Sequence, residues 1–216
     1  VYGLGGGLTC YYSELAVTDC EFLGNEAGAQ GGGLYCWSSA PVLTDCVFSG
    51  NRATGPPPAN GGAIACWWNA SPALIDCTIV RNESSHLGGA LYCNDSIPAL
   101  TNCIIAFNES PQFVIHCLTE NVPNSTPALV CCNLYGNANG DWVGCIADQY
   151  GVNGNFSEEP LFCDMGGDDM TLCANSPCLP GGNGCGVRIG ALGMGCATCY
   201  TAVERCSWGA IKAMYR

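Results

Sequence analysis

Cysteine is the residue type that could carry out the widest range of chemistry in this sequence, which holds 19 cysteines among 216 residues. Metal modules usually carry paired Cys-x-x-Cys motifs. This chain has one, Cys196 to Cys199, followed by Tyr200 rather than by the histidine of a haem-attachment motif. His86 and His116 are too few and too far apart for a zinc site. Because cytosolic thiols stay reduced, the cysteines indicate disulfides formed in an oxidising compartment, with no metal and no cofactor.

Charged residues that could catalyse are scarce. A polysaccharide lyase needs a base and cationic help for the substrate carboxylate, and residues 1–163 carry two basic side chains, Arg52 and Arg81. Hydrolysis needs two carboxylates held a set distance apart, but Asp19, Asp45 and Asp76 each precede a repeated cysteine and fit a turn role. A net charge of −12 also repels acidic polysaccharides. We therefore assign no catalytic residue and expect a protein that is not an enzyme.

One acidic loop is the remaining candidate for a cation site. No calcium-loop signature accompanies it, so a solvated loop is the favoured interpretation. Its carboxylates are Glu158, Glu159, Asp164, Asp168 and Asp169.

The elements that position these residues form an internal repeat. A glycine pair, an apolar residue and a cysteine recur, followed by a second cysteine and then by an aromatic residue or Ile three positions before Asn. The copies are 5–10, 31–36, 61–66 and 88–93, each followed by 17–25, 43–51, 74–82 and 100–108, with a looser fifth copy over 115–137. A period of roughly 27 residues lies in the range of solenoid proteins.

Such a unit holds two or three short strands, too few to bury a core alone, so the copies must stack as parallel strands. Alternation points Leu34 and Cys36 inward and Tyr35 outward. The glycine pairs suit bends with positive φ or close backbone approach, and the recurrent Asn suits left-handed turns and a hydrogen-bonded ladder. Prolines at 41, 72 and 98 argue against the helix that a leucine-rich horseshoe needs. The sequence predicts an all-β, right-handed parallel β-helix of about five to six coils.

The motifs also resemble a known family. Gly-Gly-Ala-Ile at 61–64 and Phe-x-x-Asn at 22–25 and 48–51 look like polymorphic-membrane-protein repeats, and the chain resembles cysteine-rich bacterial right-handed β-helix proteins. Segments 159–162, 176–178 and 189–191 look like the closing part that follows such repeats. The resemblance covers most of residues 1–199 and implies the fold, whereas unrelated activities share this fold.

Disulfide pairing stays open at this point. Stacked equivalents such as Cys10 and Cys36, or Cys77 and Cys103, would have Cα atoms within disulfide range, and pairing across one coil, Cys10 with Cys20, is the alternative. Buried unpaired thiols are a third interpretation. An odd total leaves at least one cysteine free or bonded to another chain. The candidates are Cys10, Cys20, Cys36, Cys46, Cys66, Cys77, Cys93, Cys103, Cys117, Cys131, Cys132, Cys145, Cys163, Cys173, Cys178, Cys185, Cys196, Cys199 and Cys206.

Two surface features follow from the repeat. Tyr11, Trp37 and Trp67 come directly after the inward cysteines, with Trp68 next to Trp67. This aromatic column either binds sugar rings or another chain, or braces the edge of a sheet. Glycosylation acceptor motifs also occur, two of them at the repeat-closing turns. The acceptors are Asn69, Asn82, Asn94, Asn108, Asn124 and Asn155.

We expect a β-helix over 1–163, a disulfide-rich cap over 164–200 and a basic tail over 201–216. A capping-box pattern at 201–204 predicts a short helix in the tail. The chain reaches its first Gly-Gly-Gly motif within five residues, which predicts an uncovered strand edge able to pair with a second molecule. The candidate docking residues of the tail are Arg205, Trp208, Ile211, Lys212, Tyr215 and Arg216.

Together these features predict a secreted, extracellular or cell-surface structural protein that self-associates head to tail into filaments. A carbohydrate-binding adhesin is the alternative, and a polysaccharide lyase or hydrolase is a third hypothesis. The expected partners are further copies of the chain and glycans, with no nucleic acid. No apolar run is long enough to span a bilayer. Because no signal-peptide pattern follows Val1, we expect the processed part of a longer precursor.

Overall fold

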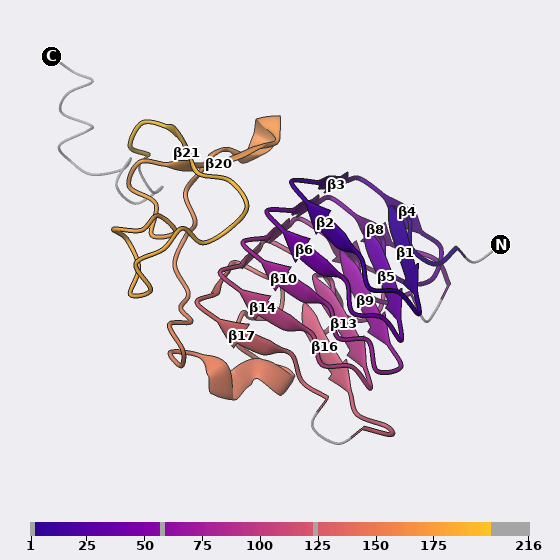
Figure 1. The fold of residues 1–216 in the computed structure, drawn as a ribbon. Helices are drawn as coiled ribbons and strands as arrows, with labels where there is room; N and C mark the ends of the chain where they lie inside the picture. Colours follow the sequence, from indigo (N-terminus) through magenta and orange to yellow (C-terminus); the bar gives the residue numbers. More distant parts are fainter. Residues whose placement is uncertain (1–2, 57–58, 123–124, 200–216) are drawn as a thin grey trace, which may run out of the picture.

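The repeat units form three parallel sheets that wind around one core. A computed structural model describes residues 3–56, 59–122 and 125–199. Each of the first five coils contributes one strand to each sheet, and equivalent strands lie side by side along the axis (Figure 1). The first sheet holds β1 (Leu8–Tyr11), β5 (Leu34–Trp37), β9 (Ile64–Trp67), β13 (Leu91–Asn94) and β16 (Ile115–Leu118).

The second and third sheets repeat this arrangement with shorter strands. The second holds β2 (Ala16–Thr18), β6 (Val42–Thr44), β10 (Ala73–Ile75), β14 (Ala99–Thr101) and β17 (Ala128–Val130). The third holds β3 (Glu21–Leu23), β7 (Val47–Ser49), β11 (Thr78–Val80), β15 (Ile104–Ala106) and β18 (Asn133–Tyr135). A small fourth sheet joins β4 (Glu26–Ala27), β8 (Arg52–Ala53) and β12 (Glu83–Ser84). The predicted stacking of parallel strands is confirmed.

The strand register places residues of the same type beside one another in neighbouring coils, because one sequence repeat corresponds to one coil. In the first sheet Leu34 lies beside Leu8 and Ile64, and Cys36 lies beside Cys10 and Cys66. Leu34 and Cys36 belong to the main core, whereas Tyr35 belongs to a separate cluster on the outer face. The predicted inward and outward alternation is therefore confirmed.

The bends between strands depend on left-handed residues. The first glycine of each pair has positive φ, as predicted, at Gly5, Gly31, Gly61 and Gly88. The second glycine has no space for a side chain, since a Cβ at Gly62 would overlap the carbonyl groups of Gly89 and Glu83. These two requirements explain why the pair recurs in the first four coils.

The predicted asparagine ladder is present, but its backbone geometry differs from the expectation. Left-handed φ values occur at the residue before each asparagine, among them Gly50 (65°) and Arg81 (55°), and not at the asparagine itself. The preceding residue makes the bend, and the asparagine then points inward. Asn82 Oδ1 accepts hydrogen bonds from the backbone nitrogen and the side-chain nitrogen of Asn51, both at 2.9 Å.

A short 3₁₀ helix, η1 (Gly144–Gln149), covers the end of the core beyond the fifth coil. Its Ile146 is fully buried among the core residues, and Trp142 and Cys145 pack against them. The disulfide between Cys117 and Cys145 ties η1 to β16. The apolar end of the last coil is thus shielded by η1.

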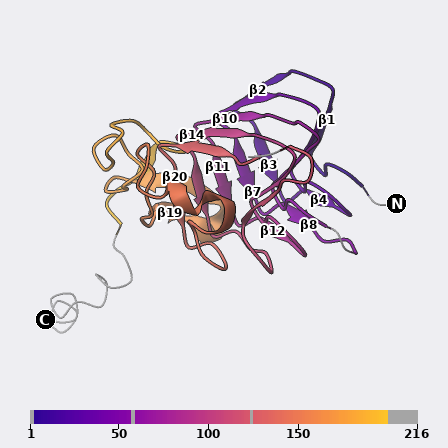
Figure 2. The ribbon, with the colours of Figure 1, turned by 90° about the horizontal axis from the view of Figure 1, so that it is seen from below.

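The C-terminal lobe (residues 159–199) lies beside the coils, not over their end (Figures 1 and 2). It contains β19 (Phe162–Asp164), η2 (Met165–Gly167), β20 (Asp169–Cys173) and β21 (Met194–Cys196). Leu172 and Ile189 of the lobe pack on Ile104 and Ala106, which face outward from the third sheet. The disulfide-rich segment expected over 164–200 thus covers the apolar outer face of β15.

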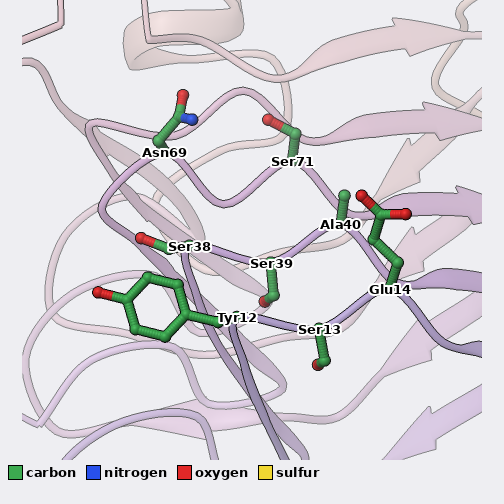
Figure 3. A pocket seen from close by; sticks show the side chains of 8 residues that line it. All are labelled: Tyr12, Ser13, Glu14, Ser38, Ser39, Ala40, Asn69 and Ser71. Atoms are coloured by element: carbon green, nitrogen blue, oxygen red, sulfur yellow. The ribbon is translucent and has the colours of Figure 1, made fainter.

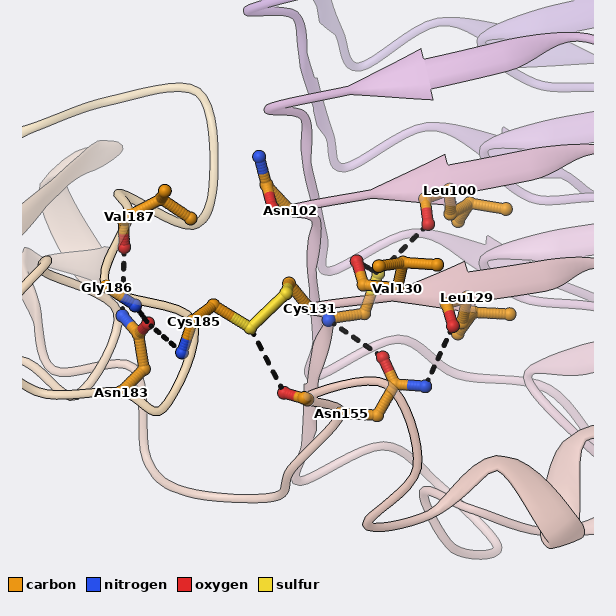
Figure 4. Close-up of a disulfide and its surroundings, with 12 residues drawn as sticks. Leu100, Asn102, Leu129, Val130, Cys131, Asn155, Asn183, Cys185, Gly186 and Val187 are labelled. Atoms are coloured by element: carbon orange, nitrogen blue, oxygen red, sulfur yellow. Dashed lines mark hydrogen bonds between the residues drawn. A yellow bond between two sulfur atoms is a disulfide. The ribbon is translucent and has the colours of Figure 1, made fainter.

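Polar contacts and one disulfide fix the lobe to the coils. Arg188 forms an ion pair with Asp45, and Arg81 pairs with Asp168. Figure 4 shows the disulfide from Cys131, which follows β17, to Cys185 in the lobe. In the described part of the chain, no helix is long and apolar enough to span a membrane. The predicted tail helix and all six docking residues of the tail lie outside the described residues.

Candidate functional site

The aromatic column forms on the outer face of the first sheet, as predicted. Tyr11, Trp37 and Trp67 are register partners in β1, β5 and β9. The ring centroids of Tyr11 and Trp37 are 5.8 Å apart and those of Trp37 and Trp67 are 6.5 Å apart, with both pairs 9° from parallel. Asn94 occupies the next position in β13, so the column of rings ends there.

The rings differ in how much surface they offer to a ligand. Trp37 and Trp67 are half-buried, and Trp67 Nε1 donates a hydrogen bond to Gln30 Oε1 at 3.2 Å. By contrast Tyr12 is 71% exposed and Trp68 is 51% exposed. The Trp68 ring packs on Trp37 at 5.8 Å. The column therefore braces the sheet with its inner rings and presents Tyr11, Tyr12 and Trp68 to solvent.

A groove of about 580 Å³ lies next to these rings, where the chain turns after the first sheet in three successive coils (Figure 3). Tyr12, Ser38 and Asn69 take left-handed φ values of 47°, 45° and 60° there. This geometry turns the chain sharply and leaves the groove between the stacked turns. The lining residues are Tyr12, Ser13, Glu14, Ser38, Ser39, Ala40, Asn69 and Ser71.

The groove supplies hydroxyl and amide groups rather than paired acids. Ser38 Oγ donates to the Trp68 carbonyl at 2.7 Å, which connects the wall of one coil to the next. Among the eight described lining residues, Glu14 is the single carboxylate. A glycosidase of the usual kind needs two carboxyl groups across the scissile bond. The chemistry here suits hydrogen bonding to a neutral polar ligand beside aromatic rings.

The family model for the right-handed β-helix region matches residues 2–157. The chain belongs to this right-handed β-helix family. No curated protein and no solved structure matches the chain. The narrower resemblance to polymorphic-membrane-protein repeats, and a bacterial origin, stay predictions.

In this right-handed β-helix, burial changes the titration of the aromatic face. Desolvation raises the pKa of Tyr35 to about 12, with a smaller contribution from repulsion by Tyr11. Desolvation likewise raises the pKa of Tyr92. It lowers the pKa of His116, whose buried Nδ1 has no hydrogen-bond partner. These three side chains therefore stay neutral at neutral pH.

The two basic side chains considered for catalysis are engaged elsewhere in the β-helix. Arg52 forms an ion pair with Glu83 at 2.8 Å, and Arg81 pairs with Asp168 and donates to the Met165 carbonyl at 2.6 Å. In the acidic loop, Asp169 accepts a hydrogen bond from the backbone nitrogen of Thr171 at 3.0 Å. The contacts of Arg81 with Asp168 and Met165 therefore connect this loop to the coils.

Eight of the described cysteines form disulfides: Cys117 with Cys145, Cys131 with Cys185, Cys163 with Cys196, and Cys173 with Cys199. Ten others are unpaired, and Cys206 lies outside the described residues. Neither stacked pairing nor pairing across one coil occurs in the repeats. Parallel strands about 4.8 Å apart hold equivalent Cβ atoms farther apart than the 3.5–4.5 Å of a disulfide. The unpaired residues are Cys10, Cys20, Cys36, Cys46, Cys66, Cys77, Cys93, Cys103, Cys132 and Cys178.

Most of the predicted glycosylation acceptors lie inside the fold. Asn82, Asn94, Asn108 and Asn155 are at most 4% exposed, and the first, third and fourth donate their side-chain nitrogen to backbone carbonyls. In the folded chain these four amides leave no room for a glycan. Asn69 is exposed and stays a predicted acceptor, whereas Asn124 lies outside the described residues.

Proposed function

We propose that this right-handed β-helix is a secreted or cell-surface protein that binds a carbohydrate chain along its aromatic face. The observation that carries the proposal is the set of aligned rings at Tyr11, Trp37 and Trp67, with exposed Tyr12 and Trp68 beside a groove of hydroxyl and amide groups. Self-association, the leading expectation from the sequence, becomes the second candidate. The side chains that line the groove suit a carbohydrate ligand, and this favours glycan binding.

Pyranose rings match this surface in two ways. Their C–H faces are apolar and pack on flat aromatic rings, while their hydroxyl groups exchange hydrogen bonds with serine, tyrosine and asparagine side chains. The first three coils place a ring at equivalent positions about 4.8 Å apart, with polar side chains at the turns that follow, so a linear glycan lying along the axis would meet several of these groups. A neutral glycan fits better than an acidic one because the chain carries a net charge of −12.

An extracellular location agrees with four disulfides in the described residues, since such bonds persist in oxidising compartments. Binding without turnover is part of the proposal, because Glu14 is the single carboxylate among the described residues of the groove. The protein would then hold a glycan in place without cutting it.

The test compares variants at the exposed rings with a matched control. About half of the Trp68 surface is open, so covering it with a sugar should contribute about 1 kcal/mol, or roughly a fivefold change in affinity. We expect Tyr12→Ala with Trp68→Ala to weaken binding by roughly 30-fold in calorimetry against neutral polysaccharides. Tyr150→Ala removes an aromatic ring that is 58% exposed near η1, and it should leave binding unchanged. Equal affinities for the double variant and the wild type would contradict the proposal.

Head-to-tail self-association is the second candidate, and the charge of the tail favours it. Residues 201–216 carry Arg205, Lys212 and Arg216 against one acidic side chain, whereas the chain as a whole has a net charge of −12. Light scattering of the full chain beside a version that ends at Tyr200 tests this candidate. Assemblies that disappear on truncation would support docking through the tail, and a monomer in both cases would contradict it.

A further inference from the structure

Four cysteine sulfurs gather at one point of the C-terminal lobe. Cys163 is bonded to Cys196, and Cys173 is bonded to Cys199. The two disulfides lie against each other, because Cys196 Sγ is 3.5 Å from Cys173 Sγ and 3.9 Å from Cys199 Sγ. The sulfurs of Cys163, Cys173 and Cys196 all lie within 4.8 Å of one another. We call these four residues the cysteine quartet.

Backbone hydrogen bonds hold the quartet together independently of the sulfur bonds. Strands β20 and β21 pair in parallel, which places Cys173 beside Cys196, and β19 joins β20 on its other side. The turn from Cys196 to Cys199 is clamped by Asn175. Its Oδ1 accepts from the Cys199 backbone nitrogen at 2.9 Å, and its Nδ2 donates to the Cys199 carbonyl at 2.7 Å. Breaking the disulfides therefore leaves a frame that keeps the four side chains convergent.

The quartet is also accessible. Cys173 is buried, whereas Cys163, Cys196 and Cys199 are partly exposed. Cys163 and Cys199 line a cavity of about 280 Å³, together with Phe162 and Met165. A small reductant or a hydrated ion can reach the sulfurs through this opening.

We propose that the cysteine quartet, once reduced, binds one Zn²⁺ ion through four thiolates. Tetrahedral zinc with Zn–S bonds of about 2.3 Å requires sulfurs about 3.8 Å apart. Two of the four non-bonded separations, 3.5 and 3.9 Å, lie on either side of that value. The sulfurs of Cys163 and Cys199 must move closer together when the metal binds, because Cys199 lies outside the group of three sulfurs within 4.8 Å. The metal would replace the two disulfides as the link between β19, β20 and β21.

The conversion balances with a dithiol as the reductant. Two dithiol molecules deliver four electrons and four protons, each becoming a disulfide, while the two protein disulfides become four thiols. Zinc then replaces the thiol protons, which pass to solvent. Oxidation of the thiolates by a disulfide oxidant would reverse the sequence and release the ion.

The other cysteines of the described chain do not converge in this way. In the repeat, Cys36 has one equivalent cysteine on each side, and two successive coils separate the outer pair by roughly 10 Å. Cys131 and Cys185 form a single disulfide. These arrangements provide matched controls for the quartet.

The experiment uses the full chain, reduced with a dithiol, desalted without oxygen and titrated with Co²⁺ and then Zn²⁺. We expect one equivalent of metal, a tetrahedral cobalt–thiolate absorption spectrum and displacement of cobalt by zinc. Cys196→Ser with Cys199→Ser should abolish the spectrum, whereas Cys131→Ser with Cys185→Ser should keep it. Full metal binding by the first double variant, or no binding by the reduced wild type, would overturn the proposal.

A second measurement needs no variant and so does not depend on how the variants fold. Zinc added to the reduced chain should slow alkylation of Cys163, Cys173, Cys196 and Cys199 at least tenfold, as read by peptide mass spectrometry. Protection of other cysteines instead of these four would overturn the assignment. Neither the metal titration nor the alkylation measurement depends on glycan binding, so a negative result for zinc binding leaves the proposed glycan binding untouched.

Discussion

Replacing Asn82 with alanine should be among the most damaging single changes in the coils. Its side chain is fully buried at the centre of the asparagine ladder. Nδ2 donates to the Phe48 carbonyl at 2.9 Å and to Asn108 Oδ1 at 3.0 Å, while Oδ1 accepts from Asn51 twice. Alanine keeps none of these bonds and leaves the Asn51 backbone N–H without its acceptor.

The magnitude follows from the number of buried groups that lose a partner. Each hydrogen bond contributes about 1 kcal/mol net, and an orphaned buried group costs about 1–3 kcal/mol. For Asn82→Ala we expect the free energy of unfolding to fall by about 3–5 kcal/mol. Stability in a stacked repeat depends on contacts between neighbouring coils, so a change in a middle coil weakens both of its interfaces.

Asn25→Ala is the matched control at the exposed end of the same ladder. Asn25 is partly exposed, and its side chain donates one hydrogen bond, to Asn51 Oδ1 at 2.9 Å. Its backbone nitrogen still donates to the same oxygen at 3.0 Å after truncation. We expect a loss of about 1 kcal/mol or less.

The assay is equilibrium unfolding in urea at neutral pH with the disulfides intact, followed by tryptophan fluorescence and by circular dichroism. The difference between the two variants is the decisive quantity. If Asn82→Ala and Asn25→Ala lowered the free energy of unfolding by the same amount, the buried hydrogen bonds of the ladder would not be what stabilises the coils.

Three further predictions concern the end of the core, the bends and the aromatic face. Ile146→Ala should lower the free energy of unfolding by about 2–5 kcal/mol, measured in the same assay, because it opens a cavity under η1. Gly62→Ala should cost about 3 kcal/mol or more, since the new Cβ overlaps the Gly89 carbonyl. Gly24→Ala, at a φ of 59° with open space around it, should cost only about 1–2 kcal/mol. Tyr35 should titrate near pH 12, because its burial favours the neutral phenol. Its raised pKa stabilises the fold below about pH 10, and this stabilisation is lost as the pH rises through 12. A spectrophotometric titration checks the pKa, because the Tyr35→Phe variant should lack the ionisation step near pH 12.

The sequence by itself determined the coil and most of its surface. A repeat that returns the same residue type to the same strand position leaves parallel, in-register stacking as the arrangement that buries every copy. Alternation in a strand then decides which side chains face inward. The pattern therefore predicts the inward orientation of Leu34 and Cys36 and the outward orientation of the aromatic column. The glycine bends and the asparagine ladder followed from the same periodicity. The pattern does not show that the residue before each asparagine is the left-handed one, because it does not show that a ladder asparagine points inward instead of turning the chain.

Only the tertiary structure decided how the ends of the coil are closed and how the cysteines are used. No periodicity relates the C-terminal lobe to the coils, so its position against β15 depends on long-range packing of Leu172 and Ile189 that no local pattern encodes. The groove likewise forms from turns of three coils, and its shape depends on left-handed residues that differ in type from coil to coil.

Cysteine pairing depends on where Cβ atoms point, which a one-dimensional pattern does not specify. The stacked cysteines of the coils do not bond to one another, because a parallel register keeps their Cβ atoms too far apart. Cys117 bonds Cys145 instead, and the others are unpaired thiols, all buried except Cys20. The four cysteines that converge come from positions 163, 173, 196 and 199, which share no repeat spacing, and the sheet of the lobe brings them together.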